Sequence, residues 1–177
     1  MIRTQRLILR PFQDADLPPL AEQNADPVVM RFLSGPQTRA QSDAWAARAI
    51  EHQARHGFGK WAVEAPGIAP FIGAVGLTHV PYEASFTPAV EVAWRLNRAY
   101  WGHGYATEAA LAAIEDGFQR VGLREIVAVT ALGNVASRRV MERLRMREVL
   151  EFDHPLVPPA SALRRHVLYR LPAPGSA

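Results

Sequence analysis

The sequence contains no cysteine, and this absence excludes disulfides, thiolate metal sites and cysteine nucleophiles. Lysine is nearly absent as well, because Lys60 is the only one and arginine carries the other basic charges. No apolar run reaches the roughly 18 residues that cross a bilayer, and the N-terminus shows no signal-peptide core. We therefore expect a cytoplasmic protein without membrane contact. Its 177 residues suffice for one domain with its own core.

The formal net charge of +3 leaves the class of partner open. A basic balance suits a nucleic acid or a smaller polyanion, and it also arises from an arginine-rich solvated surface. A cluster of arginines lies within ten residues: Arg138, Arg139, Arg143, Arg145 and Arg147. At helical spacing these side chains spread over several faces, and no aromatic platform for single strands accompanies them. A nucleic-acid partner is therefore not expected, although Arg138 or Arg139 could meet a ligand phosphate.

Hydrophobic periodicity predicts alternating strands and helices. Asp16 and Asn134 have the character of helix N-caps, and the helix of residues 107–121 has an apolar stripe of Leu111, Ile114, Phe118 and Val121. The order of elements indicates a mixed α/β (α+β) fold, with a mixed sheet of about seven strands and helices on both faces. Residues 1–171 are expected to form a single domain, and residues 172–177 a disordered tail. The predicted strands are 7–11, 60–64, 71–77, 89–96, 126–130, 147–152 and 166–169, and the other helices follow Asp16, Thr38 and Asn134.

A turn with two glycines joins the strand that ends at Leu96 to the helix expected from Thr107. Gly102 and Gly104 allow positive φ and close approach of an anion, and the helix start offers unpaired N–H groups. A plain strand-to-helix connection would look the same in isolation. The turn lacks the lysine of a P-loop and the third glycine and acidic residue of a dinucleotide fingerprint, so neither motif is present.

The residues on both sides of this turn distinguish a ligand-binding turn from a plain connection. The run Tyr100-Trp101-Gly102-His103-Gly104-Tyr105-Ala106-Thr107-Glu108-Ala109 resembles the acetyl-CoA-binding motif of GNAT-superfamily N-acetyltransferases, most closely the branch of ribosomal-protein N-terminal acetyltransferases. The segment Glu91–Leu96 resembles the family strand before the motif. The segment Asn134-Val135-Ala136-Ser137 lies where the family has a second contact with coenzyme A. In this branch a glycine usually follows the last motif helix, where this chain has Arg145; a left-handed φ there would strain an arginine by about 1 kcal/mol.

The resemblance implies a mostly antiparallel sheet in which strands 89–96 and 126–130 splay apart and hold acetyl-CoA as co-substrate. It implies that the pyrophosphate is bound by backbone N–H groups of Trp101, Gly102, His103, Gly104, Tyr105, Ala106 and Thr107. The backbone of Trp94 and Leu96 would pair with the pantetheine arm and polarise the thioester, and Asn134 and Ser137 would contact coenzyme A. No metal is expected.

Direct attack on the thioester needs a neutral amine, which calls for a general base. Glu91 is the first candidate, because alternation places it on the strand face opposite Val90, Val92 and Trp94. An ion pair with an arginine is its alternative role. His154 is the second candidate base. Ser137 would donate a hydrogen bond to the departing thiolate or, alternatively, only help to cap its helix.

The expected activity is therefore acetyl transfer from acetyl-CoA to a primary amine, either a protein N-terminus or a small molecule. A non-catalytic acyl-CoA-binding protein of the same fold is the first alternative, and a basic nucleic-acid-binding domain the second. Residues 26–58, 79–88 and 153–163 would select the acceptor, and they carry no recognisable motif. A homodimer is compatible with the sequence.

Overall fold

The computed structural model describes residues 1–175 and contains one eight-stranded sheet. Its strand order is β1-β2-β3-β4-β5-β6-β8-β7, and every neighbouring pair is antiparallel except β5 and β6. The mixed, mostly antiparallel sheet predicted from the sequence is thus confirmed. The strands are β1 (Ile2–Arg3), β2 (Ile8–Arg10), β3 (Lys60–Ala65), β4 (Ala69–His79), β5 (Val90–Leu96), β6 (Glu125–Ala131), β7 (Arg147–Asp153) and β8 (Arg165–Pro172).

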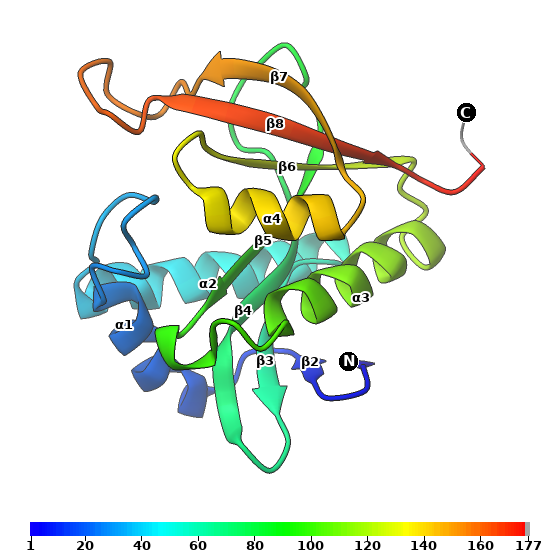
Figure 1. Ribbon diagram of the computed structural model, residues 1–177. Helices are drawn as coiled ribbons and strands as arrows, with labels where there is room; N and C mark the ends of the chain where they lie inside the picture. Colours follow the sequence, from blue (N-terminus) through cyan, green and yellow to red (C-terminus); the bar gives the residue numbers. More distant parts are fainter. Residues whose placement is uncertain (176–177) are drawn as a thin grey trace.

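Four α-helices cover the two faces of the sheet, as expected. They are α1 (Leu17–Ala25), α2 (Arg39–His56), α3 (Tyr105–Gln119) and α4 (Val135–Arg143). Figure 1 shows α3 and α4 in front of the sheet and α2 behind it. Two short 3-10 turns, Asp14–Asp16 and Arg98–Tyr100, precede α1 and α3. Within residues 1–175, no helix is long and apolar enough to cross a membrane.

The largest part of the core lies between the sheet and α3. It includes Val63, Val75 and Val92 on the strands and Ala113 and Ile114 on the helix, all with 2% or less of their surface exposed. Small residues form most of the buried face of α3, so this helix packs close to the sheet. The apolar stripe predicted for it is wrong at Leu111, which is 45% exposed. The alanines, which a hydrophobic stripe does not single out, take its place.

The remaining differences from the sequence prediction are one additional strand and the ends of elements. The sheet has eight strands rather than about seven, because the two-residue β1 is too short to show alternation. Asp16 stands in the N-cap position of α1, but its side chain makes no cap hydrogen bond. Its carboxylate instead receives two hydrogen bonds from Arg10, at 2.7 and 2.9 Å, and the N–H of Gln13 at 2.8 Å, which caps the preceding 3-10 turn. A buried ion pair between β2 and the start of α1 therefore replaces the predicted cap.

The tail predicted from residue 172 starts within ordered structure. Pro172 is the last residue of β8, and the N–H of Ala173 donates to the carbonyl of Arg124 at 2.8 Å. Residues 176 and 177 of that predicted tail lie outside the described residues.

Candidate active site

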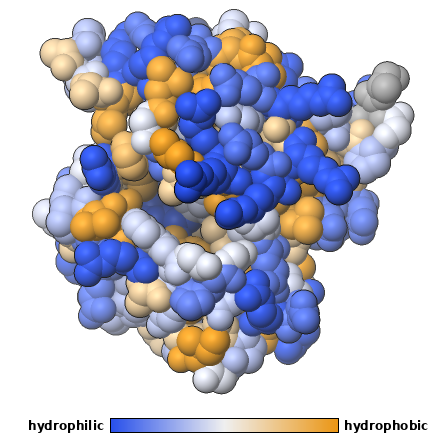
Figure 2. All heavy atoms as spheres, in the orientation of Figure 1, coloured by the Kyte–Doolittle hydropathy of each residue, from blue (hydrophilic) through white to orange (hydrophobic). Residues whose placement is uncertain are grey.

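The sheet opens between its two parallel strands. β5 pairs with β4 along its whole length, from Val90 to Leu96, whereas it meets β6 in a single registered pair, Glu91 with Val127. Figure 2 shows the surface hollowed between α4 and the loop before α3. Beyond Glu91 the edge of β5 is therefore available to a ligand, as the predicted splay of strands 89–96 and 126–130 requires.

The backbone of β5 directs alternate residues toward that opening. The N–H of Asn97 donates to the carbonyl of Ile72 on β4 at 2.9 Å. Because successive residues of a strand direct their backbone polar groups to opposite sides, Leu96 and Trp94 direct theirs toward β6. The carbonyl of Leu96 accepts the indole N–H of Trp101 at 2.8 Å. The two predicted residues of β5 thus lie at the edge of the opening, and one of them also fixes the next loop.

The glycine turn ends in a helix N-terminus. Gly102 and Gly104 both have φ of 80°, and Gly104 is the N-cap of α3. α3 begins at Tyr105 rather than at the predicted Thr107, because Gly104 in the left-handed region turns the chain directly into the helix. The first intrahelical bond runs from Glu108 N–H to Gly104 O. The N–H groups of Tyr105, Ala106 and Thr107 have no acceptor one turn earlier, which creates a site for an anion.

An arginine near the N-terminus holds this turn in place. Arg6 donates to the carbonyl of His103 at 3.0 Å and forms an ion pair with Glu108 at 2.6 Å. Its guanidinium also lies over the Tyr105 ring, 4.8 Å from the centroid. His103 stacks on the same ring from the loop side. Arg6 was not singled out in the sequence, because 97 positions separate it from His103 and no local pattern links them.

Glu108 lies in the first turn of α3, where an unpaired carboxylate would repel a bound anion. Burial favours the neutral acid, but hydrogen bonds from Thr4 and Arg6 and the charge of Arg6 outweigh it, so the pKa of Glu108 lies below its usual value. The ionised carboxylate is therefore neutralised by Arg6. Because the N-terminal segment neutralises Glu108, the backbone N–H groups and the helix dipole determine the electrostatics of the anion site.

Glu91 lies where β5 and β6 part. It is half-buried, on the strand face opposite the α3 core that contains Val90 and Val92, as predicted. Burial raises the pKa of Glu91, and the positive charge of Lys60 partly offsets this rise. Burial in turn lowers the pKa of Lys60 to about 8. A carboxylate with a raised pKa is a stronger base than an ordinary glutamate.

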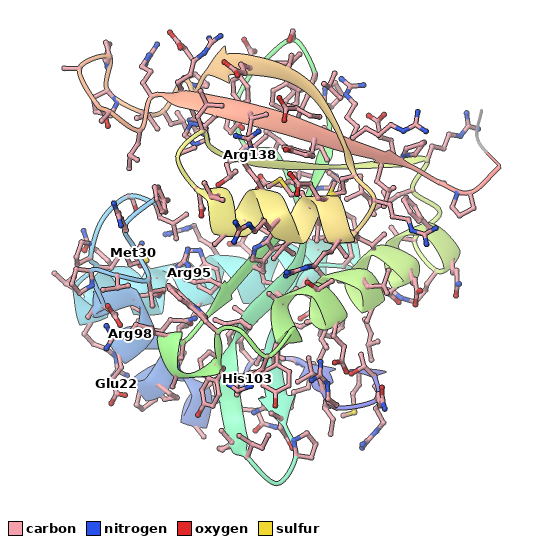
Figure 3. The ribbon with its side chains drawn as sticks, in the orientation of Figure 1. Glu22, Met30, Arg95, Arg98, His103 and Arg138 are labelled. Atoms are coloured by element: carbon pink, nitrogen blue, oxygen red, sulfur yellow. The ribbon has the colours of Figure 1, made fainter. Side chains whose placement is uncertain are left out.

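The same face of β5 carries Arg95. Its guanidinium donates to the Asn24 side chain on α1 at 2.5 Å and lies over the Trp45 ring, 5.1 Å from the centroid. Figure 3 shows Arg95 between Arg138 and His103 in this view. Within residues 1–175, Glu91 forms no ion pair with this or another arginine, although that was its alternative predicted role. Lys60 is instead the nearby positive charge that affects its pKa.

Tyr82 is a polar neighbour of Glu91 and lies in the segment 79–88 that the sequence assigned to acceptor selection. Its hydroxyl is buried and has no hydrogen-bond partner within residues 1–175. Burial and the charge of Glu91 both raise the pKa of Tyr82. The phenol therefore stays protonated and can donate a hydrogen bond on the face of the sheet that carries Glu91.

Asn134 and Ser137 form one hydrogen-bonded unit at the start of α4. The Asn134 side chain accepts the Ser137 N–H at 3.4 Å, which makes it the N-cap, as predicted. Its amide donates to Ser137 Oγ at 3.0 Å and to Thr130 on β6 at 2.9 Å. Because Ser137 Oγ accepts this bond, its own proton is free to be donated to a ligand. Capping and ligand binding are therefore compatible roles.

His154 is poorly suited to serve as the base. Its Nδ1 accepts the N–H of Leu156 at 3.2 Å, so the neutral ring carries its proton on Nε2. Burial, followed by the charges of His166 and Arg164, lowers its pKa to about 4. Neither nitrogen is thus a ready acceptor near neutral pH, and Glu91 stays the stronger candidate.

A cavity of about 380 Å³ lies between α1 and the loop after β5. Figure 3 labels Glu22 and Arg98, which contribute to its two sides. Both polar atoms of the Gln23 amide are buried without a partner within the described chain. Gln23, 2% exposed, is one of the residues that line this cavity. The residue lies just before the segment 26–58 that the sequence assigned to acceptor selection.

The arginine cluster is used partly within the fold. Arg138 forms an ion pair with Glu148 at 3.1 Å and donates to the Tyr169 hydroxyl at 3.4 Å. Arg145 lies in the turn after α4 and Arg147 begins β7. Figure 2 shows a hydrophilic region over α4, yet these residues belong to three successive parts of the fold. The arginines of this cluster therefore do not form one continuous basic surface on a single element.

Comparisons with known proteins agree with this geometry. The acetyltransferase (GNAT) domain model matches residues 6–147. The N-acetyltransferase YnaD of Bacillus subtilis, itself uncharacterized, is 31% identical over 147 residues, which cover 82% of each protein. An acetyltransferase structure from Agrobacterium tumefaciens superposes with a TM-score of 0.78 at 27% identity, covering 96% of this chain and 92% of that one.

The ribosomal branch is represented among the structures of the same fold. RimL, a ribosomal L7/L12 α-N-protein acetyltransferase solved with coenzyme A, superposes with a TM-score of 0.78 over 96% of each chain, at 15% identity. At that identity the likeness concerns the fold alone. The family model spans the splayed strands, the glycine turn and the start of α4. This chain belongs to the GNAT acetyltransferase family.

Proposed function

We propose that this chain transfers an acetyl group from acetyl-CoA directly to a primary amine, within a single domain of residues 1–171. The opening beside β5 is the observation that carries this proposal, because it joins free strand backbone to the anion site at Gly102–Thr107. An elongated co-substrate with a diphosphate at one end and a thioester at the other fits both features. Family membership supports acyl transfer as the reaction.

The donor would be held mainly by backbone groups. The N–H groups from Gly102 through Thr107 would bind the pyrophosphate, with Arg6 keeping their loop in place. The predicted donor Trp101 is not among them, because its N–H already donates to the carbonyl of Arg98 at 3.2 Å. The backbone of Trp94 and Leu96 would pair with the pantetheine arm, and an N–H there would polarise the thioester carbonyl. Because these dipoles are fixed by the fold, they stabilise the developing oxyanion without reorganising.

The acceptor would approach from the face that carries Glu91. The nitrogen of the acceptor amine forms a bond to the carbonyl carbon of the thioester, and the C–S bond breaks. One proton leaves that nitrogen for the Glu91 carboxylate, directly or through water. Ser137 donates a hydrogen bond to the departing thiolate, while Asn134 holds the serine oxygen. No covalent enzyme intermediate is needed, in accord with the lack of cysteine.

Two classes of acceptor fit this arrangement, a protein N-terminus and a small-molecule amine. The cavity beside Gln23 and the half-buried face of Arg95 offer polar contacts for either class. The name of RimL describes the first class for that protein. A cytoplasmic location and a homodimer stay predictions.

The decisive experiment measures free thiol released from acetyl-CoA in the presence of a panel of small amines and of peptides with different N-termini. We expect release that depends on the added amine, and a substrate from one class with much the highest kcat/KM. Ser137→Ala should lower kcat with little change in the KM for acetyl-CoA, because its hydrogen bond strengthens as charge develops on sulfur.

Two other outcomes would contradict the proposal. If no amine supports release while coenzyme A still raises the melting temperature, the chain is an acyl-CoA-binding protein without transferase activity. If coenzyme A has no effect and the chain instead binds nucleic acid in a salt-sensitive manner, the basic-domain alternative holds.

A further inference from the structure

Three of the six histidines meet at one point of the fold. His52 and His56 lie one turn apart in the last part of α2, and His79 is the last residue of β4. One ring nitrogen from each lies within 4.8 Å of the other two. Imidazole is the side chain that most often binds metal ions in proteins, and it suits zinc, copper, iron and nickel.

The spacing of the nitrogens suits a tetrahedral ion. His52 Nε2 and His79 Nδ1 are 3.2 Å apart. Two ligands of a tetrahedral zinc ion, each about 2.0–2.1 Å from the metal, are separated by about 3.3 Å. The His56 ring lies close to both others, with centroid distances of 4.6 Å to His52 and 4.5 Å to His79. Small side-chain rotations would bring its nitrogen into the same coordination sphere.

The tautomer of His52 is already set for metal binding. Its Nε2 receives the backbone N–H of His79 at 3.2 Å, so Nε2 carries a lone pair. Its Nδ1 lies 3.0 Å from the carbonyl of Phe58 and is therefore the protonated donor. A ligating histidine commonly donates its second N–H to a backbone carbonyl, which orients the ring and makes it more basic. A metal ion would replace the weak contact with His79 N–H.

The surroundings keep the rings together while leaving access to solvent. Phe58, 6% exposed, packs against all three rings, with centroid distances of 5.2 to 6.1 Å. His56 and His79 are exposed and His52 is half-buried. Three protein ligands leave one position of a tetrahedron for water or for a donor from a bound molecule.

We propose that His52, His56 and His79 bind one divalent transition-metal ion of the zinc class. The ion would link the C-terminal end of α2 to the end of β4. This link matters for the fold because β4 leads into the loop that returns as β5 with Glu91. The proposal does not depend on acetyl transfer, and it departs from the sequence prediction that no metal is bound.

The first test uses the full chain without an affinity tag, freed of metal by a chelator. Calorimetric titration with Zn²⁺ should show one ion bound per chain, and Co²⁺ should give the intense visible absorption of a tetrahedral complex. His56→Ala and His79→Ala should each weaken binding by about tenfold or more, since even loss of an outer-shell partner has an effect of that size. His103→Ala, which removes a distant exposed histidine, should bind Zn²⁺ as the unchanged chain does.

A second readout separates metal binding from loss of the fold. Without metal, the His56→Ala and His79→Ala chains should melt close to the unchanged chain, because both side chains are exposed. Zn²⁺ should then raise the melting temperature of the unchanged chain and of His103→Ala, and not that of the two cluster variants. Equal binding by all four chains, an absence of binding, or an octahedral Co²⁺ spectrum would overturn the proposal.

Discussion

Glu91 and Lys60 are the ionisable pair on which the proposed base depends. The two side chains reach the same face of the sheet from β5 and β3, which flank β4. Burial disfavours the charged form of each, so the pKa of Glu91 is raised and that of Lys60 falls to about 8. Each charge also favours ionisation of the other. This balance makes two predictions possible at the scale of single residues.

Glu91→Gln should lower kcat at neutral pH by about 10²- to 10⁴-fold, the usual contribution of a general base. In the proposed mechanism the carboxylate must be ionised, so kcat/KM, expressed per neutral acceptor amine, should fall as pH decreases through the pKa of Glu91, which burial raises above its ordinary value. Glu91→Gln should lack this acid limb. Glu115→Gln, an exposed glutamate on α3, is the matched control and should keep the full profile. A Glu91→Gln enzyme with normal kcat would show that another group is the base.

Lys60→Met should move the acid limb of the kcat/KM profile to higher pH. The positive charge of Lys60 lowers the pKa of Glu91, so its removal leaves burial unopposed and raises that pKa further. Lys60→Arg retains the charge and is the control that should keep the limb near its original position. If the acid limb of the Lys60→Met profile moves to lower pH, or does not move, the profile does not report the ionisation of Glu91.

The start of α3 is an element whose geometry depends on glycine. Gly104→Ala places a side chain at φ of 80° and brings its Cβ within 3.4 Å of the Arg6 guanidinium. We expect a several-fold higher KM for acetyl-CoA, because the first N–H groups of the helix would shift. Gly122→Ala introduces the same left-handed strain just after the other end of α3, in open space, and should lose a similar amount of stability without changing KM. Equal KM values for acetyl-CoA in the two variants would show that the glycine turn does not bind the donor.

The end of α4 carries strain that a single substitution can relieve. Arg145 has φ of 61° and is the only non-glycine residue with positive φ among residues 1–175. The Met146 N–H bonds to the Met141 carbonyl at 3.0 Å, and both methionines are buried, which is the pattern of a Schellman motif with Arg145 as its left-handed residue. The strain expected from the sequence is thus present.

Arg145→Gly should stabilise the protein by about 0.5–1 kcal/mol, the relief of left-handed strain less the added freedom of the unfolded chain. Denaturant unfolding gives the change in free energy. Arg143→Gly, two residues earlier and inside α4, should instead destabilise by about 1 kcal/mol. If both glycines destabilise equally, Arg145 makes a contact whose loss outweighs its strain.

At the scale of the whole molecule, the sheet is joined at its middle by the single registered pair of β5 and β6. Coenzyme A would add hydrogen bonds to β5 and fill this opening. At 100 times its dissociation constant it should stabilise the folded state by about 2.7 kcal/mol. Hydrogen exchange should slow in Val92–Leu96 and at the start of α3. ADP, which has the diphosphate without the pantetheine arm, should protect the start of α3 and leave β5 unchanged. Protection confined to other strands would place the ligand elsewhere.

The local geometry of the proposed donor site was largely predictable because its residues are close in sequence. Leu96, the glycine turn and the helix that follows occupy one continuous segment, and the capping of α4 by Asn134 needs only Ser137, three residues later. Local backbone geometry decides such features, so motif and spacing suffice. The errors of detail, the early start of α3 and the exposed Leu111, arose where glycine conformation and packing against the sheet set the outcome.

The sequence by itself determined the mixed fold, the order of its elements, the glycine turn and the face of β5 on which Glu91 lies, because periodicity and turn residues act over a few positions. Only the tertiary structure brought Arg6 onto His103, Lys60 toward Glu91, and His79 onto His52 and His56. Those contacts join segments separated by many residues, and their existence depends on strand order and register. The electrostatic partner of the proposed base Glu91 and the histidine cluster are therefore properties of the folded chain.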